Sequence, residues 1–130
     1  MFKDFDGWNK KKKEVDQKKE RAFFKEGEIW WANLGLNIGV EIDGKGTAFT
    51  RPVIIIKKYN QFSFLGIPLS TSKKLHYSRF FIGLIAGKEA AANIFQVRSL
   101  DSLRLENKIG QISSDFLNEL KEKASQVNFG

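Results

Sequence analysis

The stretch RPVIIIKKYNQFSFLGIPL, residues 51–69, decides the expected fold. Residues 51–59 and 62–69 are each rich in β-branched and aromatic side chains, which favour strands. The residues between them, 59–61, are typical of a hairpin turn. Three consecutive isoleucines, residues 54–56, indicate that both faces of the first strand are covered. The stretch therefore predicts an antiparallel hairpin whose first strand is central in a curled sheet.

Short strand-like runs separated by turn residues continue on both sides of this hairpin. They lie at residues 28–34, 39–42, 77–84 and 93–100. The expected fold class is mainly β with flanking helices (α+β), a small barrel-like body with a closing helix. Ser113 or Ser114 can cap that helix. Its apolar face is spaced for packing against the sheet and carries Phe116, Leu117, Leu120 and Ala124.

The N-terminal residues 1–26 are predicted to form a charged helical extension of a domain that covers residues 27–130. A helix is expected over residues 6–22, because Trp8, Val15 and Ala22 are seven residues apart and form one narrow apolar stripe. Lysines surround this stripe. Two interpretations follow: a solvated helix that docks its apolar stripe on the body, or an arm that binds nucleic acid.

The charge balance of the chain is basic. Of 130 residues, 22 are Lys or Arg and 15 are Asp or Glu, which gives a formal net charge of +7. This excess favours nucleic acid, an anionic membrane surface or an acidic protein as a partner. The longest strongly apolar stretch, residues 80–86, is far shorter than the ~20 residues of a membrane span. We therefore expect no membrane span and no membrane partner. The sequence has neither a cysteine nor an Asn-x-Ser/Thr acceptor, which is compatible with the cytoplasmic location that we expect.

The residue counts also exclude several chemistries. There is no cysteine and only one histidine. Disulfide frameworks, thiolate nucleophiles, zinc sites built from Cys or His, and paired-histidine catalysis are therefore excluded. The acidic residues are scattered, which gives no support to glycosidase or two-metal nuclease chemistry. We expect neither a metal ion nor a cofactor.

One glycine-rich stretch comes close to a phosphate-binding loop. GVEIDGKG, residues 39–46, has Gly46 where such a loop needs a Ser or Thr to hold the metal ion. It also precedes a predicted strand rather than a helix. A glycine-rich connection between strands is the better interpretation.

Four motifs in order resemble the MazF/PemK family of toxin endoribonucleases from bacterial toxin-antitoxin pairs. They are EIWWANL (28–34) with IGVE (38–41), TRPV (50–53), LGIPLSTS (65–72), and QVRSLD (96–101) with RL (104–105) and KIG (108–110). The resemblance runs from residue 27 to the end of the last helix and leaves the first 26 residues outside the family core. It implies an SH3-like barrel with helices that forms a homodimer.

The chemistry that this resemblance implies is metal-independent cleavage of single-stranded RNA such as mRNA. The ribose 2′-hydroxyl attacks its own phosphate and leaves a cyclic phosphate. Arg51 would stabilise the charge that grows on the phosphoryl oxygens, because a guanidinium presents several donors in a planar fork. Ser70, at a position where the family usually has Thr, would hold the phosphate or assist proton movement. Thr71 is the alternative hydroxyl, since adjacent strand residues face opposite sides.

The resemblance also indicates substrate-binding residues. Gly39 and Glu41 match a loop that covers substrate, and Gln96 could read a base edge in a splayed single strand. Basic side chains could contact phosphate groups, although each could equally be ordinary solvated charge. The candidates for this role in our prediction are Lys57, Lys73 and His76.

Two further pairs of residues have structural interpretations. Trp30 and Trp31 point to opposite faces of a regular strand, so one should lie in the core and the other on a packing surface or a stacking platform. Asp101 and Arg104 are assigned to an ion pair or a turn, because a carboxylate repels an RNA phosphate.

The implied partners are single-stranded RNA, an acidic antitoxin that folds on binding, and a second copy of the chain in a homodimer. The alternative function is binding without catalysis. CcdB-like toxins share the fold and poison gyrase through protein contacts, and a non-catalytic RNA-binding protein is equally compatible. A third possibility is that the N-terminal helix covers the site in cis.

Overall fold

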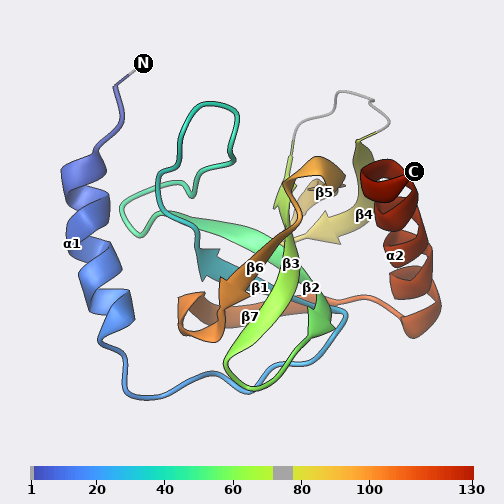
Figure 1. Ribbon diagram of the computed structural model, residues 1–130, viewed down its shortest axis with the longest axis horizontal. Helices are drawn as coiled ribbons and strands as arrows, with labels where there is room; N and C mark the ends of the chain where they lie inside the picture. Colours follow the sequence, from blue (N-terminus) through green and yellow to red (C-terminus); the bar gives the residue numbers. More distant parts are fainter. Residues whose placement is uncertain (1, 72–77) are drawn as a thin grey trace.

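The central hairpin forms as the sequence predicts. In the computed structural model, which describes residues 2–71 and 78–130, β2 (Thr50–Lys58) pairs antiparallel with β3 (Ser63–Ser70). The N–H of Tyr59 donates to the carbonyl of Ser63 at 3.2 Å and closes the turn. β2 also pairs antiparallel with β1 (Glu28–Asn33), so β2 is a central strand (Figure 1).

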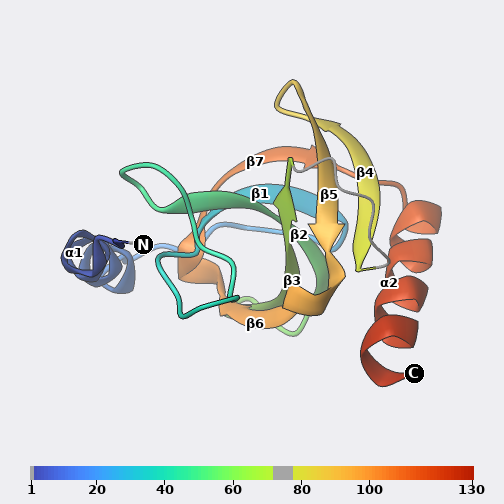
Figure 2. The same ribbon diagram turned by 90° about the horizontal axis from the view of Figure 1, so that it is seen from above.

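The strands form one curled antiparallel sheet of seven strands. Six strands follow the order β4-β5-β3-β2-β1-β7. The seventh, β6, is outside this order and pairs with β3. Seen from above, the sheet curls into a half-barrel (Figure 2). The mainly β class with flanking helices is therefore confirmed. The remaining strands are β4 (Arg79–Ile85), β5 (Lys88–Asn93), β6 (Arg98–Asp101) and β7 (Leu105–Gln111).

Both faces of β2 are covered by apolar side chains. Ile54 and Ile56 belong to a cluster that includes residues of the C-terminal helix, α2 (Ser114–Phe129). Ile55 points the other way, into a second cluster that contains Phe24 and Phe64. Alternation of side chains along a strand is the physical reason why consecutive isoleucines supply two separate cores.

The helix α2 begins where the sequence predicts. The hydroxyl of Ser113 accepts a hydrogen bond from the N–H of Phe116 at 3.1 Å, a cap of a kind that contributes about 1 kcal/mol. The ring of Phe116 packs on Phe80 of β4, with centroids 5.2 Å apart. The buried face of the helix consists of Leu117, Leu120 and Ala124.

The N-terminal helix is shorter than predicted. α1 (Phe5–Asp16) ends well before residue 22. The segment that follows contacts the barrel instead: Lys18 Nζ donates to the carbonyl of Leu103 at 2.9 Å, and Arg21 pairs with Asp101 at 2.5 Å. These tertiary contacts override the helix propensity of the segment. In both views α1 and α2 lie on opposite sides of the sheet (Figures 1 and 2).

Two strand predictions need correction, and a third is borne out within the described residues. Residues 39–42 lie in the loop between β1 and β2 and form no strand; Gly39 has a φ of +57° there. The strand expected at 93–100 is divided, because the 3-10 helix η1 (Ile94–Gln96) separates β5 from β6. The strand expected at 77–84 is β4, and residue 77 lies outside the described residues.

The strand β7 and most of β5 were not predicted. Their sequences, LENKIGQ and KEAAAN, contain few residues that favour strands, so pairing with neighbouring strands decides their conformation. A second 3-10 helix, η2 (Ser102–Arg104), leads into β7. Among the helices of the described ranges, none combines the length and the hydrophobicity needed to cross a bilayer.

Candidate functional site

Arg51 lies near the start of β2, where the strand leaves the long loop that follows β1. Its side chain is only 9% exposed. Arg51 Nε donates to the main-chain carbonyl of Asp43 at 2.6 Å, and Nη1 donates to the carbonyl of Leu69 at 3.2 Å. Burial lowers the pKa of Arg51, and the charge of the Asp43 carboxylate raises it. The guanidinium is therefore held in a fixed orientation mainly by carbonyl groups.

Ser70 is the last residue of β3, next to Leu69, whose carbonyl accepts from Arg51. The pairing of β2 with β3 ends at Val53 and Pro68, and Ser70 pairs with Ala91 of β5. The hydroxyl of Ser70 also accepts a hydrogen bond from Arg79 Nη1 at 3.0 Å. Thr71 follows the end of β3 and is exposed.

A cavity of about 480 Å³ brings these groups together. Such a volume is typical of small-molecule sites. The cationic residues of its lining are Lys45, Arg51 and Lys88, and the lining contains no carboxylate side chain among the described residues. The hydroxyl-bearing residues are Thr50, Ser70 and Thr71. The apolar side is made by Trp31, Pro52, Leu69, Ile85, Ala86 and Ala90.

The two tryptophans have separate positions. Trp30 is 8% exposed and belongs to the apolar cluster of Phe24 and Phe64. Trp31 is half-buried and lines the cavity. The core role therefore falls to Trp30, and Trp31 supplies an aromatic side chain to the cavity that Arg51 also lines.

Three of the predicted substrate-binding residues lie in or against the loop and do not line the cavity. Gly39 and Glu41 are exposed in the loop between β1 and β2, where Glu41 Oε1 accepts from the N–H of Ile38 at 2.9 Å. Gln96 holds this loop: its side chain accepts from Ile42 N–H and donates to the carbonyl of Val40, both at 3.1 Å. The side chain of Gln96 thus binds the loop in this structure, and its predicted base-reading role stays a prediction.

Lys57 is exposed near the opposite end of β2 from Arg51. Six residues of extended strand separate the two positions by roughly 20 Å, so Lys57 is not part of this cavity. Lys73 and His76 lie outside the described residues, and their predicted roles stay predictions.

The sequence analysis missed two cationic residues that line the cavity and one that bonds to its lining. Lys45 was considered only as part of the glycine-rich stretch, and Lys88 stands at the start of the unpredicted strand β5. Arg79, which orients Ser70, is at the start of β4. A lysine or arginine next to a turn has no local pattern that distinguishes it from solvated charge, so no sequence signal could have selected these three.

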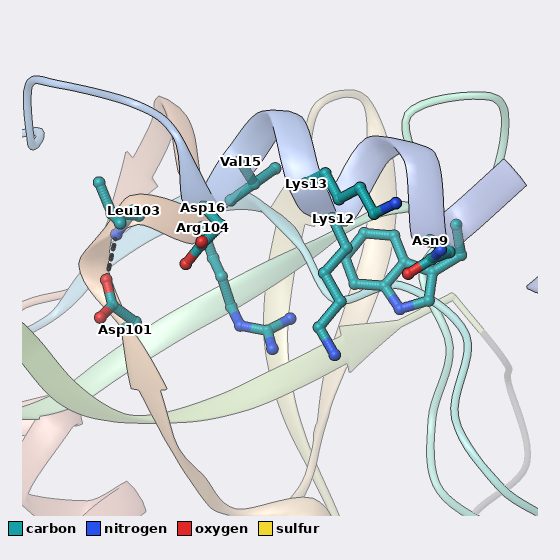
Figure 3. A pocket seen from close by; sticks show the side chains of 9 residues that line it. Asn9, Lys12, Lys13, Val15, Asp16, Asp101, Leu103 and Arg104 are labelled. Atoms are coloured by element: carbon teal, nitrogen blue, oxygen red, sulfur yellow. Dashed lines mark hydrogen bonds between the residues drawn. The ribbon is translucent and has the colours of Figure 1, made fainter.

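A second cavity, of about 430 Å³, lies between α1 and the barrel (Figure 3). Lys12 extends into it from α1 and Arg104 from η2. It also contains two carboxylates, from Asp16 and Asp101, so its charge is mixed. This lining lacks the purely cationic character of the cavity at Arg51.

Asp101 and Arg104 have structural roles, as expected, and each has its own set of partners. Asp101 accepts from the N–H of Leu103 at 2.8 Å, a turn contact that caps η2, and its ion pair is with Arg21. Arg104 Nη1 donates to the main-chain carbonyl of Asn33 at 2.8 Å. Burial and the charge of Arg98 lower the pKa of Arg104.

No grouping of three or more His, Asp or Glu side chains suited to a metal ion occurs within the two described ranges. Residues 2–24 contribute no side chain to the lining of the cavity at Arg51. The possibility that the N-terminal helix covers this site in cis therefore finds no support in the lining.

Comparison with solved structures shows the same fold. MazF from Deinococcus radiodurans superposes with a TM-score of 0.70 at 19% identity, covering 84% of this chain and 99% of that one. The MazE-MazF structure from the same organism gives a TM-score of 0.63 at 18% identity and covers 82% and 95% of the two chains. An endoribonuclease from a mycobacterial species, in complex with its cognate antitoxin, gives 0.60 at 12% identity and covers 80% and 93%.

Sequence comparison identifies the family. None of the curated proteins matches this chain. Residues 25–127 match the family described as PemK-like, MazF-like toxins of type II toxin-antitoxin systems. This match contains all four motifs, the strand of Arg51 and the strand end at Ser70, and it excludes α1. Since the match covers most of the chain, the protein belongs to the PemK-like, MazF-like family of toxins of type II toxin-antitoxin systems.

Proposed function

We propose that this chain is an endoribonuclease that cleaves single-stranded RNA without a metal ion and acts as the toxin of a toxin-antitoxin pair. The observation that carries the proposal is the lining of the cavity at Arg51. Three cations, three hydroxyls and an aromatic side chain surround one space that has no carboxylate among its described lining residues. Such a site attracts a phosphodiester and offers a stacking surface to a base.

Arg51 is the group that stabilises the transition state in this proposal. Two carbonyls, from Asp43 and Leu69, orient its guanidinium before substrate binds. A donor that is already oriented needs little reorganisation when negative charge grows on the phosphoryl oxygens. Removal of one such donor costs about 3–4 kcal/mol in comparable sites.

The reaction forms a bond from the ribose 2′-oxygen to phosphorus and breaks the bond from phosphorus to the 5′-oxygen. The 2′-hydroxyl loses a proton and the 5′-oxygen gains one, which yields a 2′,3′-cyclic phosphate and a 5′-hydroxyl. Ser70, whose oxygen accepts from Arg79, can donate its own hydroxyl proton to a phosphoryl oxygen. Lys45 and Lys88 hold the neighbouring phosphates, and Trp31 stacks on a base.

The test uses a long single-stranded RNA in the presence of EDTA. We expect the wild type to make discrete cuts that end in cyclic phosphate, and Arg51→Ala to cut about 10²–10³-fold more slowly. Lys57→Ala is the matched control, because it removes a cation outside the cavity and should cut at the wild-type rate. Circular dichroism confirms that each variant is folded. If Arg51→Ala does not fold, the Lys45→Ala/Lys88→Ala variant serves in its place.

Absence of cleavage by the wild type, under the same conditions and in the presence of divalent cations, would contradict the proposal. The binding-protein alternative would then be the better account, either as a gyrase poison or as a non-catalytic RNA-binding module. Cleavage that needs a divalent cation would contradict its metal-independent part.

We also propose two protein partners. The first is an acidic antitoxin, supported by the net charge of +7 and by the structures of MazE-MazF and of an endoribonuclease with its cognate antitoxin, which share this fold. The second is another copy of the chain in a homodimer, as the family resemblance implies. Analytical ultracentrifugation of the purified chain measures the homodimer, and co-purification with the protein of a neighbouring reading frame tests the antitoxin.

A further inference from the structure

The position of Arg51 depends on a loop that has no regular secondary structure over most of its length. Of its two carbonyl acceptors, Asp43 O belongs to the loop between β1 and β2, at 2.6 Å from Arg51 Nε. Gly35 and Gly46 take positive φ values of 75° and 73°, conformations that glycine adopts without strain. Around Asp43 the loop is held by its own hydrogen bonds, from Gly44 N–H to the carbonyl of Gly35 at 2.7 Å and from Asn37 Nδ2 to the carbonyl of Ile42 at 2.8 Å, and by a contact from outside the loop.

Lys3, from the segment before α1, supplies one of these contacts. Its Nζ pairs with Asp43 Oδ2 at 2.9 Å and donates to the carbonyl of Asn37 at 2.8 Å. Asp43 Oδ1 accepts from the N–H of Asn37 at 2.6 Å. Both carboxylate oxygens of Asp43 are thus engaged, and both groups of the ion pair are three-quarters or more buried.

The rest of the extension brings Lys3 to this loop. The ring of Trp8 packs so closely on Gly35 that a β-carbon there would lie 2.0 Å from Trp8 Cε2. It also contacts Phe49, with ring centroids 5.6 Å apart. Asp4 caps α1 by accepting from the N–H of Gly7 at 2.9 Å. The extension lies outside the family match, so this support is a feature of this chain beyond the shared domain.

The charge of Lys3 has a second consequence. Asp43 carries the carboxylate whose charge acts on Arg51. Because Lys3 and Asn37 hold that carboxylate, Arg51 bonds to the main-chain carbonyl of Asp43 and not to its side chain. A released carboxylate could pair with the guanidinium and compete with an RNA phosphate for its donors.

We propose that Lys3 is a positioning residue for Arg51, acting through Asp43, and that the N-terminal extension thereby keeps the guanidinium available to substrate. The effect on cleavage rests on the proposed function. The effect on Arg51 itself does not, because it can be measured on the protein without RNA.

The first measurement follows the Arg51 Nε–H signal in ¹⁵N-labelled full-length protein with any tag on the C-terminus. The signal is assigned by its loss in Arg51→Lys. Because this N–H is hydrogen-bonded and the side chain is buried, we expect slow exchange with solvent in the wild type and about tenfold faster exchange in Lys3→Met. Lys11→Met is the matched control, since Lys11 pairs with Glu14 within α1. It should exchange like the wild type.

The second measurement separates kcat from KM for RNA cleavage. Lys3→Met should lower kcat about tenfold and change KM less than twofold, and Lys3→Arg should restore most of the rate. Asp43→Asn, which keeps an acceptor for Asn37 but loses the ion pair, should have the same effect. Adding Lys3→Met to Asp43→Asn should cause no further loss.

Wild-type exchange and wild-type kcat in Lys3→Met would overturn the proposal, and so would additive effects in the double variant. A wild type that does not cleave RNA would contradict the proposed function alone. In that case the exchange of the Arg51 N–H still decides whether Lys3 positions Arg51.

Discussion

At the scale of single residues, Arg51 is buried and still lines the cavity in which we propose that RNA binds. Desolvation disfavours its charged form, and the carbonyls of Asp43 and Leu69 compensate by accepting its N–H groups. A guanidinium has five N–H donors, so two can be used for orientation while others face the cavity. The ammonium of a lysine is a compact group and lacks the planar fork of donors that a guanidinium has. Arg51→Lys should therefore not replace Arg51 in RNA cleavage.

Ser70 and Thr71 can be distinguished by substitution. We expect Ser70→Ala to lower the rate of RNA cleavage about 10–100-fold, because Ser70 lines the same cavity as Arg51 and is oriented by Arg79. Thr71→Ala should lower it less than threefold, since Thr71 is exposed beyond the end of β3. Single-turnover kinetics on a short RNA measures both. The reverse order of effects would show that Thr71 supplies the active hydroxyl.

At the scale of elements, Glu28 joins β1 to its surroundings. Glu28 Oε1 accepts from Lys25 N–H at 2.8 Å and from the indole Nε1–H of Trp30 at 3.1 Å, and Oε2 pairs with Lys108 of β7 at 3.0 Å. Burial alone would raise the pKa of Glu28, but these hydrogen bonds and the charge of Lys108 lower it below its ordinary value of 4.5.

This shift predicts a dependence of stability on pH. Because the folded-state pKa of Glu28 is lower than the unfolded-state pKa, its contribution is present above the unfolded value and is lost as pH falls through the folded one. Between about pH 6 and about pH 3, the wild type should therefore lose more free energy of unfolding than Glu28→Gln does. Near neutral pH the substitution should cost about 1–2 kcal/mol. Urea titrations at several pH values measure these differences.

Lys108→Met gives a matched comparison, since it removes one of the donors to Glu28 and leaves the other two. Its loss of stability on acidification should be intermediate. Parallel curves of unfolding free energy against pH for the wild type and Glu28→Gln would show that the carboxylate has no such role. Asp101 and Glu26 also have lowered pKa values. Because both are present in every variant, their contribution to the pH dependence is common to all the curves.

At the scale of the whole molecule, the extension is attached to the barrel at both ends of α1. Trp8 docks on Gly35, and Lys18 donates to the carbonyls of Leu103 and Leu105 at 2.9 Å and 3.5 Å. Phe24, near the end of the extension, is fully buried, and its ring contacts that of Phe64 in a tilted arrangement with centroids 5.3 Å apart. The docking interpretation of the helix is confirmed, and an arm that binds nucleic acid stays a prediction.

Gly35→Ala tests this docking. The added methyl would clash with the ring of Trp8, so α1 should separate from the barrel and the N-terminal segment should be cleaved faster in limited proteolysis. Gly39→Ala is the control, because Gly39 also has a positive φ but a β-carbon there meets nothing within 4 Å. Both variants carry backbone strain of about 1 kcal/mol, and only the first adds the clash. Equal proteolysis of the two would contradict the role of Trp8.

Much of the candidate site could be predicted, and the rest depended on distant contacts. Arg51 and Ser70 were selected because they occur in motifs with a fixed order, and the structure places both in one cavity. The contacts of Gln96 with Val40 and Ile42 of the loop were not predicted, and its base-reading role stays a prediction. The sequence shows that residue 96 carries a side-chain amide, which can form hydrogen bonds. It does not show the partner of this amide, because that depends on which loop packs against it in the folded protein.

The same division applies to the whole protein. By itself, the sequence determined the central hairpin, its two cores and the capped helix α2, because strand alternation, turn residues and helix caps act between near neighbours along the chain. Only the tertiary structure decided where α1 ends, which lysines accompany Arg51, and that Lys3 reaches Asp43. Those outcomes depend on contacts between residues far apart in sequence, whose energies compete with local propensity and are set by the packing of the complete fold.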